Sequence, residues 1–221
     1  MRLFSYKMTN DTGFAPNPYG HTLTLSTCKP QIRRAKLEGD WVAGFTSVAL
    51  NRDRVGEERL IYLMRIGEKV LQAKYHGDPR FQDKIPNQDC DLLESKFGDN
   101  IYRPLVLGAV EAAHFVQLPN LNHWDFANDA PCQQHAQNDL SGRFVLVADE
   151  FYYFGADAIV LPGSVRPALM RGQSGHGRQS NEEQAKRLIA YIRSHYQPGR
   201  LGDPTQQLHD RTPSTSPCGV C

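Results

Sequence analysis

The sequence contains no long hydrophobic run and no excess of charge of either sign. Its 221 residues include 25 Lys and Arg against 24 Asp and Glu, which gives a formal net charge of +1. No apolar stretch approaches the roughly 20 residues that a membrane-spanning helix needs. A net charge so close to zero provides no global field that would draw the protein onto nucleic acid or a membrane. We therefore expect no membrane partner, and a nucleic-acid site would need a local patch with few contacts.

Cysteine is scarce, with five residues in total: Cys28, Cys90, Cys132, Cys218 and Cys221. An odd and widely scattered set does not resemble the disulfide framework of a small secreted domain. Cys218 and Cys221 form a Cys-x-x-Cys motif, but the Pro/Ser/Thr-rich segment around it offers neither two further zinc ligands nor a helix start. The first residues also lack the basic region and apolar stretch of a signal peptide. These absences favour a cytoplasmic protein.

Two nucleotide-binding signatures are absent as well. No Gly-x-Gly-x-x-Gly follows a predicted strand, which argues against a dinucleotide-binding α/β fold. No Gly-Lys-Ser/Thr phosphate loop occurs either. We expect no bound cofactor, and no internal repeat is visible.

Apolar and alternating stretches predict several strands, at 2–8, 41–48, 60–69, 102–110 and 144–148. The last of these is apolar throughout, which is typical of a central strand. Pro30 can begin a short helix over 31–37, because its missing N–H costs nothing at the first helical position.

The clearest helix is predicted over 181–196. Ser180 and Glu183 have the spacing of a capping box. Apolar residues, including Leu188 and Ile192, recur at helical spacing on one face. The helix should therefore pack that face against the core.

Strands at both ends of the chain, few helices and long loops predict an α+β fold. The strands would form a curved mixed sheet or a small β-barrel with a few flanking helices. We expect one domain over 1–200, with an irregular insertion at 112–141. The polar, proline-rich segment 203–221 predicts a disordered tail.

Several motifs follow one another in an order that is specific to one family. They are Asp11-Thr12-Gly13-Phe14-Ala15-Pro16-Asn17-Pro18, Cys28-Lys29-Pro30-x-Ile32-Arg33, Gly39-Asp40-Trp41-Val42-x-Gly44, Leu60-Ile61-Tyr62-x-Met64-Arg65-Ile66, Tyr75-x-x-Asp78-Pro79-Arg80-Phe81, Gly98-Asp99-Asn100-Ile101-Tyr102 and Phe151-x-Tyr153-Phe154-Gly155. Together they resemble the nucleotide modification associated domain 2 family over most of the chain, up to about residue 162.

This resemblance implies a role in systems that make or handle modified nucleobases in bacteria and their phages. The implied partner is a modified nucleotide or nucleic acid, together with base-modifying enzymes of the same system. A looser likeness concerns the fold. The Gly39-Asp40 turn entering a strand at Trp41, followed by a Met/Ile-rich strand and Asp78-Pro79, is similar to modified-base readers of the PUA and EVE type. Those are small barrels that hold a base in an aromatic-walled pocket.

Cys28 and its neighbours are the sharpest chemical candidates. A nearby ammonium group such as that of Lys29 favours the reactive thiolate, so Cys28 is a candidate nucleophile. The alternative is a small buried residue beside a turn. Lys29 and Arg33 could pair to bind a phosphate at the helix start, or simply form a solvated basic face.

Polar residues of two stiff segments are candidates for contacts with a base. Asp11 and Asn17 lie in a loop rich in Pro and Gly, and Asp99 and Asn100 precede Tyr102. Such side chains hydrogen-bond either the Watson–Crick edge of a base or the backbone of their own turn. Asp11 is also the second candidate for a catalytic residue.

Aromatic and cationic side chains could complete such a pocket. The candidate stacking rings are Trp41, Tyr62, Phe81, Tyr102, Tyr153 and Phe154. Stacking on one ring is worth roughly 1–3 kcal/mol per base, and the alternative for each ring is core packing. Arg80 could contact a phosphate or pair with Asp78. His176 lies in a Gly-rich segment that is either a lid over phosphate or a plain linker.

Histidines at positions 114, 123 and 135 share a region with Asp125, Asp129 and Cys132. Their spacings match no standard zinc pattern, so no metal is expected. Besides a structural role as the partner of a modifying enzyme, two functions remain open. The first is recognition of a modified base or nucleotide in a pocket lined by aromatic and cationic side chains. The second is an enzyme that uses Cys28 or Asp11 on a nucleotide or a DNA base.

Overall fold

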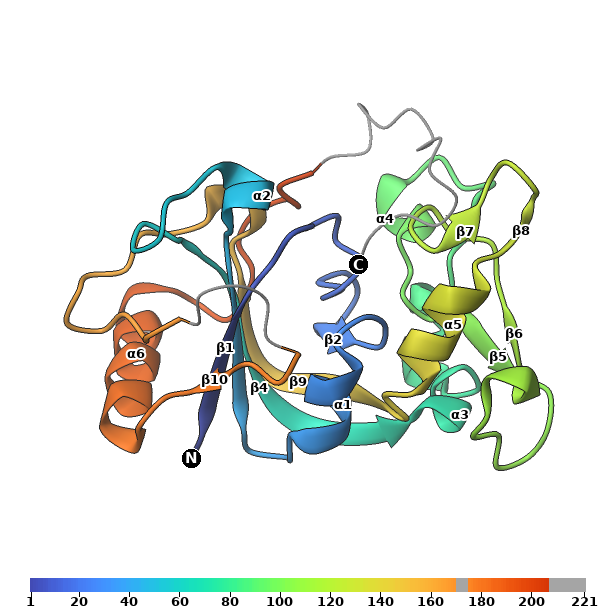
Figure 1. The fold of residues 1–221 in the computed structure, drawn as a ribbon, viewed down its shortest axis with the longest axis horizontal. Helices are drawn as coiled ribbons and strands as arrows, with labels where there is room; N and C mark the ends of the chain where they lie inside the picture. The colour runs from blue at the N-terminus through green and yellow to red at the C-terminus, as the bar shows by residue number, and fades with distance from the viewer. Residues whose placement is uncertain (170–174, 207–221) are drawn as a thin grey trace.

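A mixed sheet of seven strands forms the centre of the protein in the computed structural model, which describes residues 1–169 and 175–206. The strand order is β10-β1-β3-β4-β9-β11, and β2 also pairs with β9. The strands are β1 (Leu3–Lys7), β2 (Thr24–Leu25), β3 (Trp41–Phe45), β4 (Leu60–Leu71), β9 (Phe144–Tyr153), β10 (Arg178–Gln179) and β11 (Gly199–Arg200). Figure 1 shows this sheet running through the middle of the molecule.

The sheet is curved and open. β1 and β3 are parallel, whereas β4 is antiparallel to both β3 and β9. The pairing of β4 with β9 shifts register between Arg65 and Ile66 and again between Ile66 and Glu68, and such irregularities bend a strand pair. Among the described residues the two end strands, β10 and β11, do not pair with each other. The predicted α+β class and curved mixed sheet are confirmed, and the alternative of a closed barrel is not.

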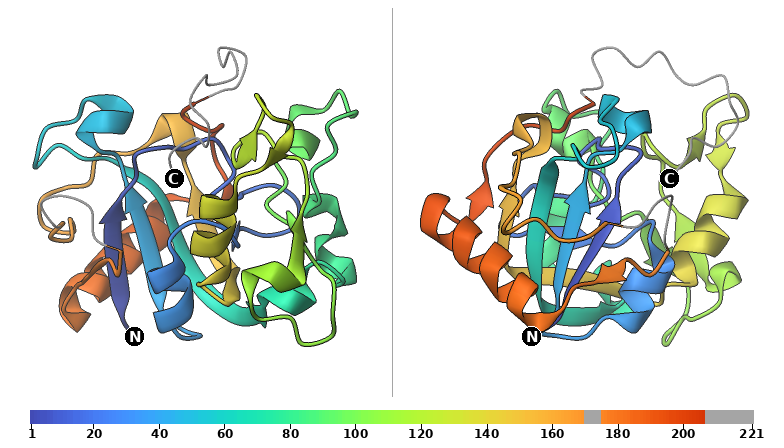
Figure 2. Two further views of the ribbon diagram at one scale, coloured as in Figure 1. Left: turned by 45° about the vertical axis from the view of Figure 1, so that its right-hand side comes forward. Right: turned by 60° about the vertical axis from the view of Figure 1, so that its left-hand side comes forward.

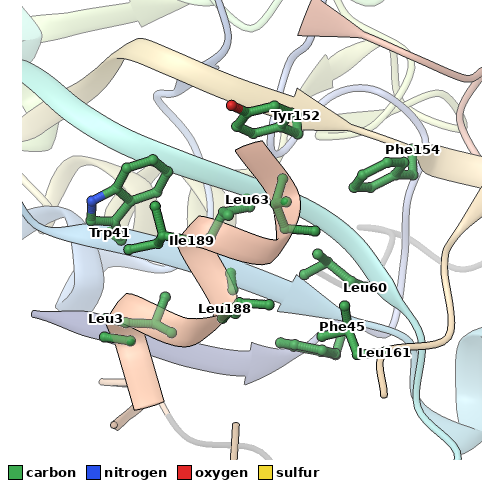
Figure 3. Close-up of a cluster of buried hydrophobic side chains, with 13 residues drawn as sticks. Leu3, Trp41, Phe45, Leu60, Leu63, Tyr152, Phe154, Leu161, Leu188 and Ile189 are labelled. Carbon is green, nitrogen blue, oxygen red and sulfur yellow. The ribbon is translucent and has the colours of Figure 1, made fainter. Parts of the chain in front are cut away.

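One face of the sheet is covered by helix α6 (Glu182–His195). Leu188, Ile189 and Ile192 of this helix are buried in one cluster with Trp41 and Leu63 of the sheet, as Figure 3 shows for most of these side chains. The predicted helix is therefore confirmed, but its cap is Asn181, whose side chain accepts a hydrogen bond from the Gln184 N–H at 2.8 Å. An Asn at this position satisfies one of the unpaired N–H groups of the first turn.

The opposite face is covered by the loop before β2, by β2 itself and by the short helix α1 (Pro30–Ala35). Leu23, Leu25 and Ile32 pack there against Val42 and other residues of the central strands. Two covered faces explain why the first five residues of β4 are all buried instead of alternating.

The remaining short elements gather beyond the far end of β4 and β9, away from α6 (Figures 1 and 2). They are α3 (Gln72–Tyr75), η1 (Pro79–Lys84), α4 (Leu93–Lys96), β5 (Tyr102–Pro104), η2 (Ala112–His114), β6 (Phe115–Gln117), β7 (Trp124–Asp125), β8 (Ala130–Pro131) and α5 (Gln133–Leu140), while α2 (Val48–Asn51) and η3 (Gly155–Asp157) flank the sheet elsewhere. The segment 112–141, predicted to be irregular, thus carries one strand of the β5–β6 pair, the β7–β8 pair and an eight-residue helix.

The ends of two strands differ most from the sequence-based prediction. The strand predicted at 102–110 ends at Pro104, a residue without a backbone N–H to donate. The strand predicted at 144–148 continues to Tyr153. Residues 207–221, most of the predicted tail, lie outside the described residues. None of the helices in the described ranges combines the length and apolar character needed to cross a bilayer.

The packing of α6 predicts a large loss of stability on truncation of its apolar face. Leu188 is fully buried, so Leu188→Ala should lower the free energy of unfolding by about 2–5 kcal/mol. The matched control is Arg187→Ala, since the Arg187 side chain is 52% exposed and its change should stay within about 0.5 kcal/mol. Urea denaturation measures both, and equal effects would contradict the described packing.

Candidate functional site

Cys28 lies between β2 and α1 in an unusual backbone conformation. Cys28 and Lys29 have φ angles of 51° and 40°, so two consecutive non-glycine residues adopt the left-handed region. Each such residue costs of order 1–3 kcal/mol and persists only where its surroundings hold it. The Cys28 N–H donates to Asp139 Oδ1 at 2.6 Å, and the Cys28 carbonyl accepts from Arg33 Nε at 2.8 Å. These bonds hold the cysteine in place.

The Cys28 side chain begins a chain of three buried groups. Its Sγ lies 3.7 Å from His123 Nε2, and His123 Nδ1 lies 2.9 Å from Asp139 Oδ2. Tyr102 donates its hydroxyl to the same Oδ2 at 2.9 Å. Cys28 is a thiol that keeps 7% of its surface exposed, whereas Asp139 has none exposed. A thiol, an imidazole and a carboxylate in this order form the constellation of nucleophilic catalysis.

The surroundings shift the pKa values of His123, Asp139 and the neighbouring His135. Burial lowers the pKa of His123, but the charges of Asp139 and Cys28 outweigh burial and raise the pKa to about 10. Burial alone would raise the pKa of Asp139, yet His123 and Arg33 keep it below its usual value. His135, whose ring centroid lies 4.1 Å from that of His123, has its pKa lowered to about 4 by burial and by the His123 charge. The site can therefore hold an imidazolium between the Asp139 carboxylate and the Cys28 sulfur at neutral pH.

Arg33 organises the backbone around this site. Its fully buried guanidinium donates to three carbonyl oxygens, those of Cys28, Asp139 and Phe144, the last at 2.9 Å. Gly142 makes room for it, because a Cβ there would lie 2.6 Å from Arg33 Cζ. Lys29 is half-buried, with its Nζ 5.1 Å from the centroid of the Tyr6 ring. Phosphate binding by Lys29 and Arg33 stays a prediction, although the Arg33 guanidinium points into the protein.

Asp11 belongs to a separate buried cluster. It accepts hydrogen bonds from the Tyr153 hydroxyl at 2.6 Å and from both the N–H and the hydroxyl of Thr205. Burial raises its pKa. Asp11 and Tyr153 thus tie the first loop to β9 and to the end of the described chain, and the catalytic role predicted for Asp11 stays untested.

Asn17 and Lys84 form a second buried pair. Lys84 Nζ donates to Asn17 Oδ1 at 2.7 Å and to the Tyr19 carbonyl at 2.6 Å. Burial lowers the pKa of Lys84 to about 8. Asn17 Nδ2 in turn donates to the carbonyls of Gly13 and Phe97. In this structure Asn17 fixes its own loop, which is the alternative to binding a base.

Asp99 and Asn100 are fully buried as well. Asp99 accepts from the hydroxyls of Thr24 at 2.7 Å and Tyr75 at 2.8 Å, and burial raises its pKa. Asn100 donates to the Phe81 carbonyl at 3.0 Å. Asp99 therefore joins the elements beyond β4 to β2, whereas Asn100 joins those elements to one another.

The six predicted stacking rings all lie in the interior. Each is 0–2% exposed: Trp41, Tyr62, Phe81, Tyr102, Tyr153 and Phe154. They pack in the hydrophobic clusters on the two faces of the sheet and around it. Base stacking on them stays a prediction that would require the surrounding elements to move.

Two predicted residues are exposed. Arg80 pairs with both Asp78 and Glu68, each at 2.7 Å, so the intramolecular alternative holds in this structure. Arg80 also borders a cleft of about 870 Å³ whose other charged residues are Glu68, Glu94, Asp149, Glu150 and Arg200. His176 is exposed beside β10, while residues 170–174 of its segment lie outside the described residues.

The sequence does not predict the grouping of Cys28 with His123 and Asp139. Its pattern points to His123 only as a possible metal ligand and contains no signal for Asp139. In the described ranges, no three or more His, Cys, Asp or Glu side chains are arranged to hold a metal ion. Cys132 is disulfide-bonded, which an odd and scattered set of cysteines did not indicate.

The raised pKa of His123 predicts a specific dependence of stability on pH. The stabilisation by protonated His123 should be complete below its unfolded pKa of about 6.5 and be lost as the pH rises through about 10. The wild type should therefore lose on the order of a few kcal/mol relative to His123→Gln across this window. Parallel denaturation series from pH 6 to 10 measure the difference. Subtracting the variant removes the opposite contribution of Lys84, and parallel curves would contradict the assignment.

Comparisons with known proteins give one match. No curated protein and no solved structure matches the chain. The sequence model of one family, described as nucleotide modification associated domain 2, matches residues 1–211. The match spans β1 to β11 and includes Cys28, His123 and Asp139. The chain therefore belongs to the nucleotide modification associated domain 2 family.

Proposed function

We propose that this protein is an enzyme of a nucleotide modification system and that Cys28 is its nucleophile. One observation carries the proposal, the buried chain from Cys28 through His123 to Asp139. The family suggests a role in such a system, and the chemistry is our inference from the geometry.

Each group has a defined part in the proposed reaction. His123 holds Cys28 as a thiolate, which attacks an electrophilic carbon of the nucleotide or DNA base and forms a carbon–sulfur bond. His123 Nε2 then gives its proton to the atom that receives the displaced electron pair. Asp139 positions the imidazole through the contact of its Oδ2 with His123 Nδ1, and Tyr102 holds that carboxylate by donating its hydroxyl to the same oxygen. Arg33 holds the left-handed backbone at Cys28.

Thiol reactivity tests the proposal without knowledge of the substrate. Cys28 should react with iodoacetamide at pH 6 at least about tenfold faster in the wild type than in His123→Gln, because the imidazolium increases the thiolate fraction. Peptide mass spectrometry reports each cysteine separately. Cys90, a thiol in another loop, is the internal control whose rate should not change.

The outcome that would contradict this role is a Cys28 rate independent of His123 in folded protein. Asp139→Asn provides a second variant with an altered charge and a similar shape. It should slow alkylation of Cys28 as well, since it removes the charge that holds His123 protonated.

Activity in the cell is the second test. In cells that carry the modification system, Cys28→Ser and His123→Gln should lower the level of the modified base on the order of 10²-fold or more. Chromatography of digested DNA measures base composition, with Cys90→Ser as the matched control. Asp11→Asn tests the competing candidate. Unchanged modification in a folded Cys28→Ser protein would rule out this nucleophile.

Recognition without chemistry is the second candidate function. The cleft of about 870 Å³ favours it, because aromatic and cationic side chains, including Tyr19, Phe151 and Arg80, border it. Four carboxylates border the cleft too, and Glu68 already pairs with Arg80, so the cleft suits an uncharged base better than a phosphate. A protein that only recognises a nucleotide would bind it with the same affinity after Cys28→Ser. The level of the modified base would then not depend on His123.

A further inference from the structure

A cavity of about 450 Å³ lies beside the Cys28 site, between α5 and the β5–β6 pair. Its wall is mostly apolar, with Phe115, Val116, Ala136 and Leu140 among the lining residues. The volume is within the range of about 300–1,000 Å³ that is typical of small-molecule sites. None of the described lining residues is Lys or Arg, so the cavity is unsuited to a phosphate.

Gln117 is a polar residue in the wall of this cavity. Only 6% of the residue is exposed. Its Nε2 donates to the His123 carbonyl, which fixes the orientation of the amide because a carbonyl can only accept. The other amide atom, Oε1, is buried and accepts no hydrogen bond from any residue that the structure describes. A buried acceptor left unpaired is unfavourable. Because Oε1 itself has almost no exposed surface, a ligand in the cavity that brings an N–H donor would satisfy it once the amide turns toward the cavity.

The same cavity shares two wall residues with the proposed catalytic chain. Tyr102 lines the cavity and donates its hydroxyl to Asp139 Oδ2 at 2.9 Å. Gln117 lines it and contacts the backbone of His123. A molecule in the cavity would therefore touch Tyr102, which helps to position the imidazole, and Gln117, which contacts the His123 backbone.

We propose that this cavity binds a flat, uncharged heterocycle with an N–H donor, namely the base of a nucleoside, with Gln117 Oε1 accepting the hydrogen bond. The choice of a nucleobase among heterocycles rests on the proposed function. The apolar wall contacts the faces of the base, and Gln117 selects for an amine or ring N–H at its edge.

Matched ligands test the hydrogen bond in the unaltered protein. Calorimetric titration with adenosine, guanosine, cytidine and thymidine should detect binding of at least one. An analogue that lacks the donor, such as purine riboside for adenosine or 2-pyrimidinone riboside for cytidine, should bind about tenfold more weakly or worse. Absence of binding by all four nucleosides, or equal affinity of a matched pair, would overturn the proposal.

A substitution that fills the cavity with a larger side chain tests whether nucleosides bind there. Ala136→Phe places a ring in the space between α5 and Phe115 and should abolish nucleoside binding. Ala190→Phe, on the exposed side of α6, is the matched control and should bind normally. If Ala136→Phe fails to fold, the ligand pairs still decide the outcome. Binding that survives in folded Ala136→Phe would overturn this site.

The two proposals can fail separately. If only the cavity proposal is wrong, no nucleoside binds, but the rate of Cys28 alkylation still depends on His123. If only the proposed catalytic role is wrong, a nucleoside binds specifically in the cavity, but the rate of Cys28 alkylation does not depend on His123.

Discussion

The carboxylate of Asp139 is the group on which the candidate site depends. It accepts from the Cys28 N–H on one oxygen and contacts both His123 and Tyr102 on the other. Its backbone carbonyl accepts from Arg33. A fully buried carboxylate is unfavourable unless such partners surround it. One side chain at the end of α5 thus joins the first loops, the β5–β6 region and the histidine segment.

Several other polar side chains of the interior also link segments that are distant in sequence. Asp11 connects the first loop to β9, Lys84 connects η1 to Asn17, and Asp99 connects the region after α4 to β2. Short elements and loops bury little apolar surface of their own, so hydrogen bonds between them fix their positions. In this fold, buried Asn and Asp side chains of these motifs therefore hold neighbouring segments together.

The sequence predicts those elements whose pattern of apolar residues lies within one continuous segment. The apolar spacing over 181–196 predicts α6, and the alternation in β1 and the apolar residues of β4 predict the sheet. Cys28 is recognisable from Lys29 beside it. His123 and Asp139 are not, because they lie 95 and 111 residues from Cys28 and only the fold brings them together. The stacking rings are ambiguous for another reason, since an aromatic residue in a strand has the same pattern in a core and in a pocket.

The left-handed conformation of Cys28 and Lys29 has a consequence for protein engineering. Glycine adopts such angles without a steric penalty, so selection for heat tolerance would favour glycine at position 29. The same replacement would enlarge the conformational freedom of the adjacent thiol. A gain in thermostability at position 29 would therefore come with a less firmly placed Cys28 thiol. The reactivity of a variant selected for heat tolerance would not represent that of the natural protein.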